Sequence, residues 1–335
     1  MISLIQLGTV DYATALALQQ QLVSLRKEEK ISDVLLLLEH KPVITLGRNA
    51  KAANIIASPE LLAQRGVELF ECDRGGDVTF HGPGQIVGYP IFDLRGFARS
   101  STNLNDLSSR AEENDSKNRS LESRDLGSSS TLRKTMGVIE FVRRLEEVLI
   151  RTCADFAIPT KRVPGLTGVW TDAGDYDAHV GTGPLSSRAK SRDPAFPGTT
   201  TDHVETAASA VTRSEARPRE QNAEAKLAAI GVHISRSVTS HGFALNVNTD
   251  LSYFNLIVPC GITSKPVTSM QQELSRPLDL NAVAESLSRN FGVVFQSQIL
   301  WVDTLDALLG RTVGVPMKPP TELRQLHKEE DTTWT

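Results

Sequence analysis

The stretch Arg74-Gly75-Gly76-Asp77-Val78-Thr79-Phe80-His81-Gly82-Pro83-Gly84-Gln85 is the most informative part of this chain. It is dense in glycine and carries one arginine and one histidine. Such a loop suits a pocket for the polar end of a substrate, because glycine lets the backbone approach a ligand closely. The stretch lacks the lysine of a phosphate-binding P-loop, and a strand-like segment follows where a dinucleotide-binding loop would open a helix. The pattern therefore favours a substrate pocket over a nucleotide site.

Apolar runs and helical periodicity around this loop predict an α/β (α+β) fold with a mixed central sheet flanked by helices. Ser58 and Pro59 form a strong helix start, because serine can cap and proline suits the first helical position. Another helix, at 137–156, has an apolar side that includes Val138 and Phe141. The remaining expected helices are 12–25 and 279–290. The expected strands are 2–7, 34–39, 43–46, 67–72, 86–92, 168–171, 226–234, 242–247 and 256–259, with 168–171 and 226–234 as hairpin partners.

Two polar tracts divide the sequence. Residues 100–134 are rich in Ser, Asn, Glu and Arg, and residues 174–222 in Gly, Ser, Thr, Arg and Pro. Such compositions bury too little apolar surface to offset the entropy of ordering, so both tracts are predicted to be disordered insertions. The expected organisation is one catalytic domain over 1–300 that these insertions interrupt, followed by a C-terminal segment, 301–335, with a polar tail.

Composition narrows the classes of function. The 335 residues hold 36 Lys and Arg against 40 Asp and Glu, and a formal charge of -4 creates no field that would gather nucleic acid. No stretch reaches the roughly 18 apolar residues of a membrane span. The three cysteines are widely spaced and form no C-x-x-C pair, which argues against disulfides and against a thiolate metal site. We expect a cytoplasmic protein without a metal site.

Cys260, in Val258-Pro259-Cys260-Gly261, is a candidate nucleophile. A buried core cysteine is the alternative, and the segment alone leaves the two about equal. A free thiol has a pKa of roughly 8.5, so a catalytic cysteine needs a nearby cation or donor. Lys226 could supply it, although a lysine at the start of a strand is by itself more often solvated. The two residues together favour an enzyme.

The glycine stretch, with Tyr89 after it, resembles the signature of the lipoyl(octanoyl) transferases. This family moves an octanoyl group from acyl carrier protein onto a lysine of lipoyl domains. Further segments match in order: Gly168-Val169-Trp170, Lys226-Leu227-Ala228-Ala229-Ile230-Gly231, His241-Gly242-Phe243-Ala244-Leu245-Asn246-Val247 and Pro259-Cys260-Gly261-Ile262. The resemblance covers most of the chain outside the two polar tracts, which are unusually long for the family.

The resemblance implies a fold related to the catalytic domain of lipoate and biotin protein ligases. It implies that Cys260 is the acyl-thioester nucleophile, and that Lys226 lowers its pKa and acts as general acid and base. It implies no cofactor and a monomer. The expected partners are octanoyl-acyl carrier protein, the lipoyl domains of 2-oxoacid dehydrogenase E2 subunits and the glycine cleavage H protein. The acyl pocket would be lined by Arg74, Gly75, Gly76, Asp77, Val78, Thr79, Phe80, His81, Ala229, Ile230, Gly231, Gly242, Phe243 and Ala244.

Three alternatives stay open at this point. A lipoate-protein ligase would share the fold but activate the free acid with ATP, and it would not need Cys260. A cysteine thioesterase or hydrolase would use Cys260 but pass the acyl group to water. A carrier-binding module without catalysis would tolerate loss of the cysteine.

Overall fold

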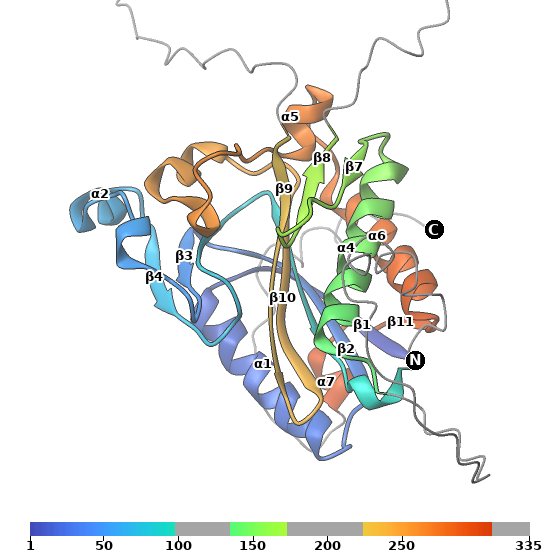
Figure 1. Cartoon of the computed structure of the whole chain (residues 1–335). Helices are drawn as coiled ribbons and strands as arrows, with labels where there is room; N and C mark the ends of the chain where they lie inside the picture. Colours follow the sequence, from blue (N-terminus) through green and yellow to red (C-terminus); the bar gives the residue numbers. More distant parts are fainter. Residues whose placement is uncertain (98–134, 173–223, 310–335) are drawn as a thin grey trace, which may run out of the picture. The chain divides into compact units, whose positions relative to one another are not determined.

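The computed structural model describes residues 1–97, 135–172 and 224–309 (Figure 1). The insertions predicted at 100–134 and 174–222 lie outside the described residues, as does the C-terminal segment from residue 310 onward. Described and undescribed parts therefore alternate along the chain, and the fold that follows is that of the described residues.

An eight-stranded mixed sheet forms their centre. Strand β1 is parallel to both of its neighbours, β11 and β2, and every other neighbouring pair in this sheet is antiparallel. The predicted mixed α/β fold and the hairpin of 168–171 with 226–234 are confirmed. The order across the sheet is β11 (Ile299–Trp301), β1 (Ile2–Val10), β2 (Asp33–His40), β6 (Gln85–Ile91), β10 (Val238–Asn246), β9 (Lys226–Ser235), β8 (Val169–Thr171) and β7 (Thr160–Lys161).

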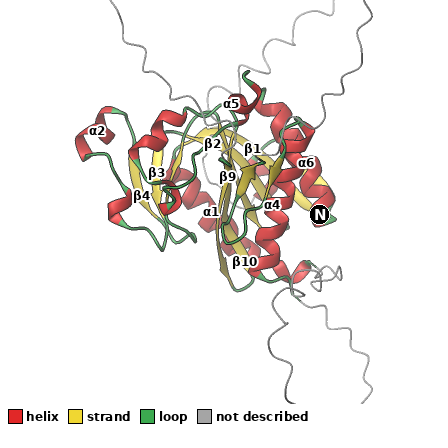
Figure 2. Ribbon diagram, turned by 45° about the horizontal axis from the view of Figure 1, so that its top comes forward, coloured by secondary structure: helices red, strands yellow, loops and turns green. Residues whose placement is uncertain are grey.

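Helices cover both faces of this sheet, as Figure 2 shows. Helix α1 (Tyr12–Lys27) packs on one face, against a cluster that includes Leu36 and Leu38. Helices α4 (Val138–Asp155) and α6 (Leu280–Phe295) pack on the other, against a cluster that includes Leu35 and Leu37. Successive side chains of a strand point to opposite faces, and residues 34–38 of β2 are all apolar because both faces of the strand are buried there.

A second, three-stranded sheet carries the glycine stretch. Its order is β4 (Glu68–Glu71), β3 (Val43–Leu46) and β5 (Val78–His81). Beside it lie the 3-10 turn η1 (Ala52–Asn54) and helix α2 (Pro59–Gln64). The predicted helix start is confirmed, because the Ser58 hydroxyl accepts a hydrogen bond from the backbone N–H of Leu61 at 3.3 Å. Ile44, Val78 and Phe80 fill a separate apolar cluster under this sheet.

The strand predicted at 256–259 is wrong. The chain forms two 3-10 turns there, η4 (Leu251–Leu256) and η5 (Pro259–Gly261), and Ile257 makes only a single bridge, to Ile55. Leu256 and Ile257 are apolar because they are buried in the cluster under the three-stranded sheet. Proline also has no N–H to donate to a ladder. Cys260 therefore lies in a turn and does not follow a strand.

Other differences occur at the ends of elements. Val138, predicted to face the core, is 51% exposed because it is the first residue of α4. Strand β11 pairs with β1 through Trp301, so the folded sheet continues past residue 300. The remaining elements are the 3-10 turn η2 (Leu94–Gly96), α5 (Met270–Leu274) and α7 (Leu305–Leu309).

Candidate active site

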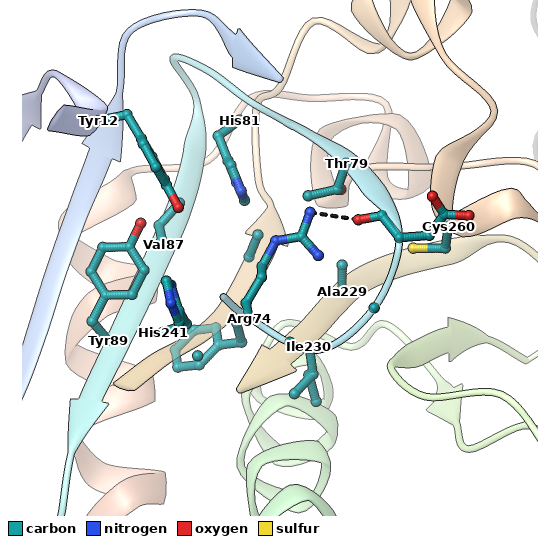
Figure 3. Close-up of a pocket in the computed structure, with 16 residues that line it drawn as sticks. Tyr12, Arg74, Thr79, His81, Val87, Tyr89, Ala229, Ile230, His241 and Cys260 are labelled. Carbon is teal, nitrogen blue, oxygen red and sulfur yellow. Dashed lines mark hydrogen bonds between the residues drawn. The ribbon is translucent and has the colours of Figure 1, made fainter. Parts of the chain in front are cut away.

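A cavity open to solvent lies between the glycine stretch and strands β9 and β10. Figure 3 shows its lining residues, with Cys260 on the opposite side of Arg74 from Tyr12, Tyr89 and His241. Of the residues predicted for the pocket, those that line it are Arg74, Gly76, Asp77, Thr79, His81, Ala229, Ile230, Gly231, Gly242, Phe243 and Ala244.

Gly75, Val78 and Phe80 are not among the residues that line this cavity. Side chains alternate along β5, so Val78 and Phe80 point into the apolar cluster while Thr79 and His81 face the cavity. The backbone N–H of Gly75 donates to the carbonyl of Val232 at 3.0 Å and ties the loop to β9. Period-two alternation would have identified both core residues from the sequence.

Lys226 and Cys260 meet beside this cavity. The Nζ of Lys226 donates to the Sγ of Cys260 at 3.1 Å. Lys226 begins β9 and is only 7% exposed, and its Nζ lies 5.1 Å from the ring centroid of buried Trp170. Cys260 lines the cavity from η5, with a left-handed backbone at φ 55°. The Lys226 amine is thus within hydrogen-bond distance of a sulfur that faces the cavity.

Arg74 organises the glycine stretch. Its guanidinium donates to the Thr45 carbonyl at 2.7 Å, to the Thr45 hydroxyl at 2.9 Å, to the Gly75 carbonyl at 3.1 Å and to the Asp77 carbonyl at 2.7 Å. The side chain is buried, and among the described residues it forms no salt bridge with a carboxylate. The buried Arg74 side chain therefore holds the loop through several hydrogen bonds at the wall of the cavity.

His81 is held neutral inside the site. Burial lowers its pKa to about 3. Its Nδ1 lies 2.8 Å from the Oε1 of Gln85, whose amide nitrogen donates to Asn246 and to the carbonyl of Phe80. The His81 Nδ1 therefore carries the proton, and its Nε2 accepts from the Thr45 hydroxyl at 3.3 Å. His81 positions its neighbours and brings no charge into the pocket.

The far side of the cavity has residues that the sequence prediction did not include. Tyr12, Val87, Tyr89 and His241 all line it. The Tyr89 hydroxyl donates to the Nε2 of His40 at 2.6 Å, because the Nδ1 of His40 donates to the Val10 carbonyl. Helical periodicity assigns Tyr12 to the core and carries no sign of a pocket.

His241 is oriented by a carboxylate. Its Nε2 lies 2.6 Å from the Oδ1 of Asp73, and its backbone N–H donates to the Oε1 of Gln19. Burial lowers the pKa of His241, and the hydrogen bond that its ring donates to the Asp73 carboxylate works against this shift. In the sequence, His241 belongs to one of the segments that carry the family resemblance, but it was not among the predicted pocket residues.

In residues 1–97, 135–172 and 224–309, no cluster of three or more His, Cys, Asp or Glu side chains could hold a metal ion. Within the same ranges, no helix is both long and apolar enough to cross a bilayer.

Comparison with known proteins now decides the family. A model of the lipoyl protein ligase A/B catalytic domain matches residues 11–111 and 128–292. The chain belongs to this family. The resemblance inferred from the glycine stretch and from the segments around Lys226 and Cys260 is therefore confirmed.

Members of the lipoyl protein ligase A/B family include similar chains of nearly the same length. An octanoyltransferase of Koribacter versatilis is 48% identical over 98% of this chain and 98% of its own. An octanoyltransferase of Acidobacterium capsulatum is 43% identical over 92% of this chain and 96% of its own. Among solved structures, a bi-partite lipoate protein ligase from Thermoplasma acidophilum is similar with a TM-score of 0.53 at 12% identity, covering 92% of this chain and 89% of its own. At that identity the likeness concerns the fold alone.

Proposed function

We propose that this protein is an octanoyltransferase, which moves an octanoyl group from acyl carrier protein to a lysine side chain of a lipoyl domain. The observation that carries the proposal is the 3.1 Å contact of Lys226 with Cys260 at the edge of the cavity. Relatives named octanoyltransferase support it over almost the whole chain. The acceptors are the lipoyl domains of 2-oxoacid dehydrogenases and the glycine cleavage H protein, and the enzyme acts as a monomer without a cofactor.

In the first half-reaction the Cys260 thiolate attacks the octanoyl carbonyl. The carbon–sulfur bond to the carrier's pantetheine breaks, and the departing thiolate takes a proton from the Lys226 ammonium. Sulfur suits the roles of nucleophile and of leaving group, because the acyl-enzyme remains a reactive thioester. The products are free carrier, an octanoyl thioester on Cys260 and a neutral Lys226.

In the second half-reaction the acceptor lysine must lose a proton before it can attack. With a reference pKa near 10.4, this deprotonation costs about 5 kcal/mol at pH 7. The neutral Lys226 takes the proton, the acceptor amine attacks the thioester and Cys260 departs as the thiolate. The proton left on the new amide nitrogen goes to solvent, so one turnover releases one proton.

The cavity beside Cys260 suits an acyl chain. Val87, Ala229, Ile230, Phe243 and Ala244 give it apolar walls. Histidines of lowered pKa near it stay neutral at pH 7, so they add no charge next to hydrocarbon. Each buried methylene contributes roughly 0.8 kcal/mol, so the depth of such a pocket can select chain length.

Two other reactions are compatible with the fold, and each differs from octanoyl transfer in its acyl donor, its intermediate or its product. An ATP-dependent ligase would join free octanoate to the lipoyl domain without a covalent adduct on Cys260. A thioesterase would form the adduct and release octanoate.

The proposal also includes a cytoplasmic location. The free thiols of all three cysteines fit a reducing cytoplasm.

Intact mass spectrometry tests the proposal. The protein is incubated with octanoyl-carrier protein, and the mass gain of one octanoyl group is identified as a thioester by its sensitivity to hydroxylamine. Peptide mapping then assigns it to Cys260. Addition of a lipoyl domain should then discharge the adduct and give an octanoyl amide without ATP. A product that appears only with ATP and free octanoate would contradict the proposal, and so would release of the whole acyl group as free acid.

A further inference from the structure

The nucleophile sits in an unusual backbone conformation. Cys260 and Gly261 are consecutive residues with left-handed backbones, at φ 55° and 67°. This region is unfavourable for a residue with a Cβ, so the surroundings must hold Cys260 in place. The contacts that hold it decide where the sulfur points.

Residues 54–57, which include the end of η1, form hydrogen bonds with the chain just before this turn. The Asn54 carbonyl accepts a hydrogen bond from the N–H of Val258 at 2.7 Å. The N–H groups of Ile56 and Ala57 donate to the Leu256 carbonyl at 2.9 and 3.0 Å. Residues 54–57 therefore pair with the chain just before Cys260.

The side chain of Asn54 joins the same region to the glycine stretch. Its Nδ2 donates to the Oδ2 of Asp77 at 2.5 Å. The other carboxylate oxygen of Asp77 accepts from the backbone N–H of Lys51 at 3.1 Å and of Val78 at 2.8 Å. In the described part of the chain Asp77 forms no salt bridge, and these three hydrogen bonds hold its carboxylate.

This pair also touches the turn that carries the nucleophile. A Cβ added to Gly261 would lie 2.9 Å from the Oδ2 of Asp77 and 3.3 Å from the Nδ2 of Asn54. The two side chains thus pack directly against the backbone next to Cys260. Asp77 itself is tied to Arg74, which donates to the Asp77 carbonyl.

We propose that Asn54 and Asp77 form a latch that locks the Cys260 turn onto the glycine stretch, which makes Asn54 a positioning residue for the nucleophile. The kinetic consequence rests on the proposed acyl transfer, whereas the structural consequence does not. Loss of the latch frees the turn and lets the sulfur move away from Lys226.

A reversal of the pair tests the latch. Asn54→Asp places two carboxylates face to face and should open it. In Asp77→Asn the new amide oxygen can still accept from Lys51 and Val78, and its NH₂ can donate to a carboxylate at position 54. The double variant Asn54→Asp/Asp77→Asn restores the hydrogen bond with donor and acceptor exchanged.

Hydrogen exchange of amides 257–262 and the alkylation rate of Cys260 by iodoacetamide are measured first, with peptide mapping to separate Cys72 and Cys153. In Asn54→Asp and Asn54→Ala we expect exchange to become about tenfold faster in this segment. The rate at which iodoacetamide alkylates Cys260 at pH 7 should change in the same two variants. The double variant should return both values to within about twofold of the original protein. Asn281→Ala, an exposed asparagine on α6, is the matched control and should change neither.

Octanoyl transfer is measured second. In the single variants kcat should fall about tenfold to 100-fold with little change in KM for the carrier, because a small displacement of a reacting group has effects of this size. The double variant should recover most of kcat. Unchanged exchange and kcat in Asn54→Asp and Asn54→Ala would overturn the latch, and so would a double variant as impaired as the singles while its thermal unfolding is normal. If the chain transfers no octanoyl group at all, the exchange and alkylation results still decide the latch.

Discussion

The amine of Lys226 lies 3.1 Å from the sulfur of Cys260, although the two residues are 34 positions apart and belong to different parts of the fold. Lys226 is fixed by β9 and by a hydrogen bond from its backbone N–H to the Pro266 carbonyl. Cys260 is fixed by the η5 turn. The contact is therefore set by the packing of the turn against the sheet, and the reactivity of the sulfur should depend on it.

Removing the charge of Lys226 tests this dependence. Lys226→Met keeps most of the side-chain volume and deletes the ammonium. We expect alkylation of Cys260 at pH 7 to slow by at least about tenfold, and acyl transfer to fall about 100-fold or more, because both thiolate stabilisation and proton transfer are lost. Rates of alkylation and of octanoyl transfer measure the two effects.

Lys265→Met is the control, because Lys265 lies 5.8 Å from the same Trp170 ring but its ammonium pairs with Glu224. A Lys226→Met protein whose Cys260 reacts at the original rate would show that the ammonium does not activate the sulfur.

Replacement of Arg74 should destabilise the protein as well as inactivate it. Arg74→Lys loses most of the hydrogen bonds to Thr45, Gly75 and Asp77 and leaves buried carbonyls without donors. We expect the free energy of unfolding to fall by about 3 kcal/mol. Urea denaturation measures it, with the exposed Arg289→Lys as control. Equal stability of the two variants would contradict a structural role for the buried guanidinium.

Acid should destabilise the fold through its buried histidines. Burial lowers the pKa of His40 to about 4 and that of His81 to about 3, against an ordinary value near 6.5. Below pH 6.5 the unfolded chain binds protons that the folded protein cannot, so stability is present above that pH and is lost as pH falls toward 4. Between pH 6.5 and 5, each histidine should lower the free energy of unfolding by about 2 kcal/mol.

Urea denaturation from pH 7 to 5 measures this loss. In His40→Gln the proton uptake on unfolding at pH 5 should decrease by about one, because glutamine does not titrate. An unchanged pH dependence in that variant would mean that His40 does not remain neutral in the folded protein.

The sequence predicted most of the sheet and the helix start at Ser58, because strand periodicity and capping residues are local signals. It also singled out Lys226 and Cys260, which the structure places 3.1 Å apart. It placed Cys260 after a strand because Leu256 and Ile257 are apolar, yet these residues are buried in a turn that packs under the three-stranded sheet. Apolar character reports burial and not backbone conformation.

Asn54 could not be found from the sequence at all. Its function depends on a contact with Asp77, which is 23 positions away, and on a backbone bond to Val258. Nothing in the residues around Asn54 distinguishes it from an ordinary turn asparagine. Tyr12 could not be recognised as a cavity residue either, because its place in the helical pattern fits a core residue equally well.

Chain-length preference should respond to the apolar wall of the cavity. Ala229 lines it beside Arg74 and Cys260 (Figure 3), and Ala229→Val adds two methyl groups there. Since each buried methylene contributes about 0.8 kcal/mol, kcat/KM for octanoyl-carrier protein should fall about tenfold, with a smaller loss for hexanoyl. Ala63→Val on the exposed side of α2 is the control. An equal loss for both chain lengths would argue against a role of this wall in acyl selection.

Trp170 should govern how firmly the ammonium of Lys226 is held at the sulfur. The indole is fully buried, its Nε1 has no hydrogen-bond partner in the described part of the chain, and the Lys226 Nζ lies over its ring. A cation over an aromatic face gains about 0.5–2 kcal/mol, and this attraction is lost in Trp170→Leu but largely kept in Trp170→Phe. Both substitutions remove volume from the core and should lower the melting temperature. Only the leucine variant should slow Cys260 alkylation at pH 7, by about fivefold, because the amine can then turn away from the sulfur. If the two variants slow the reaction equally, the volume of Trp170 matters and its ring face does not.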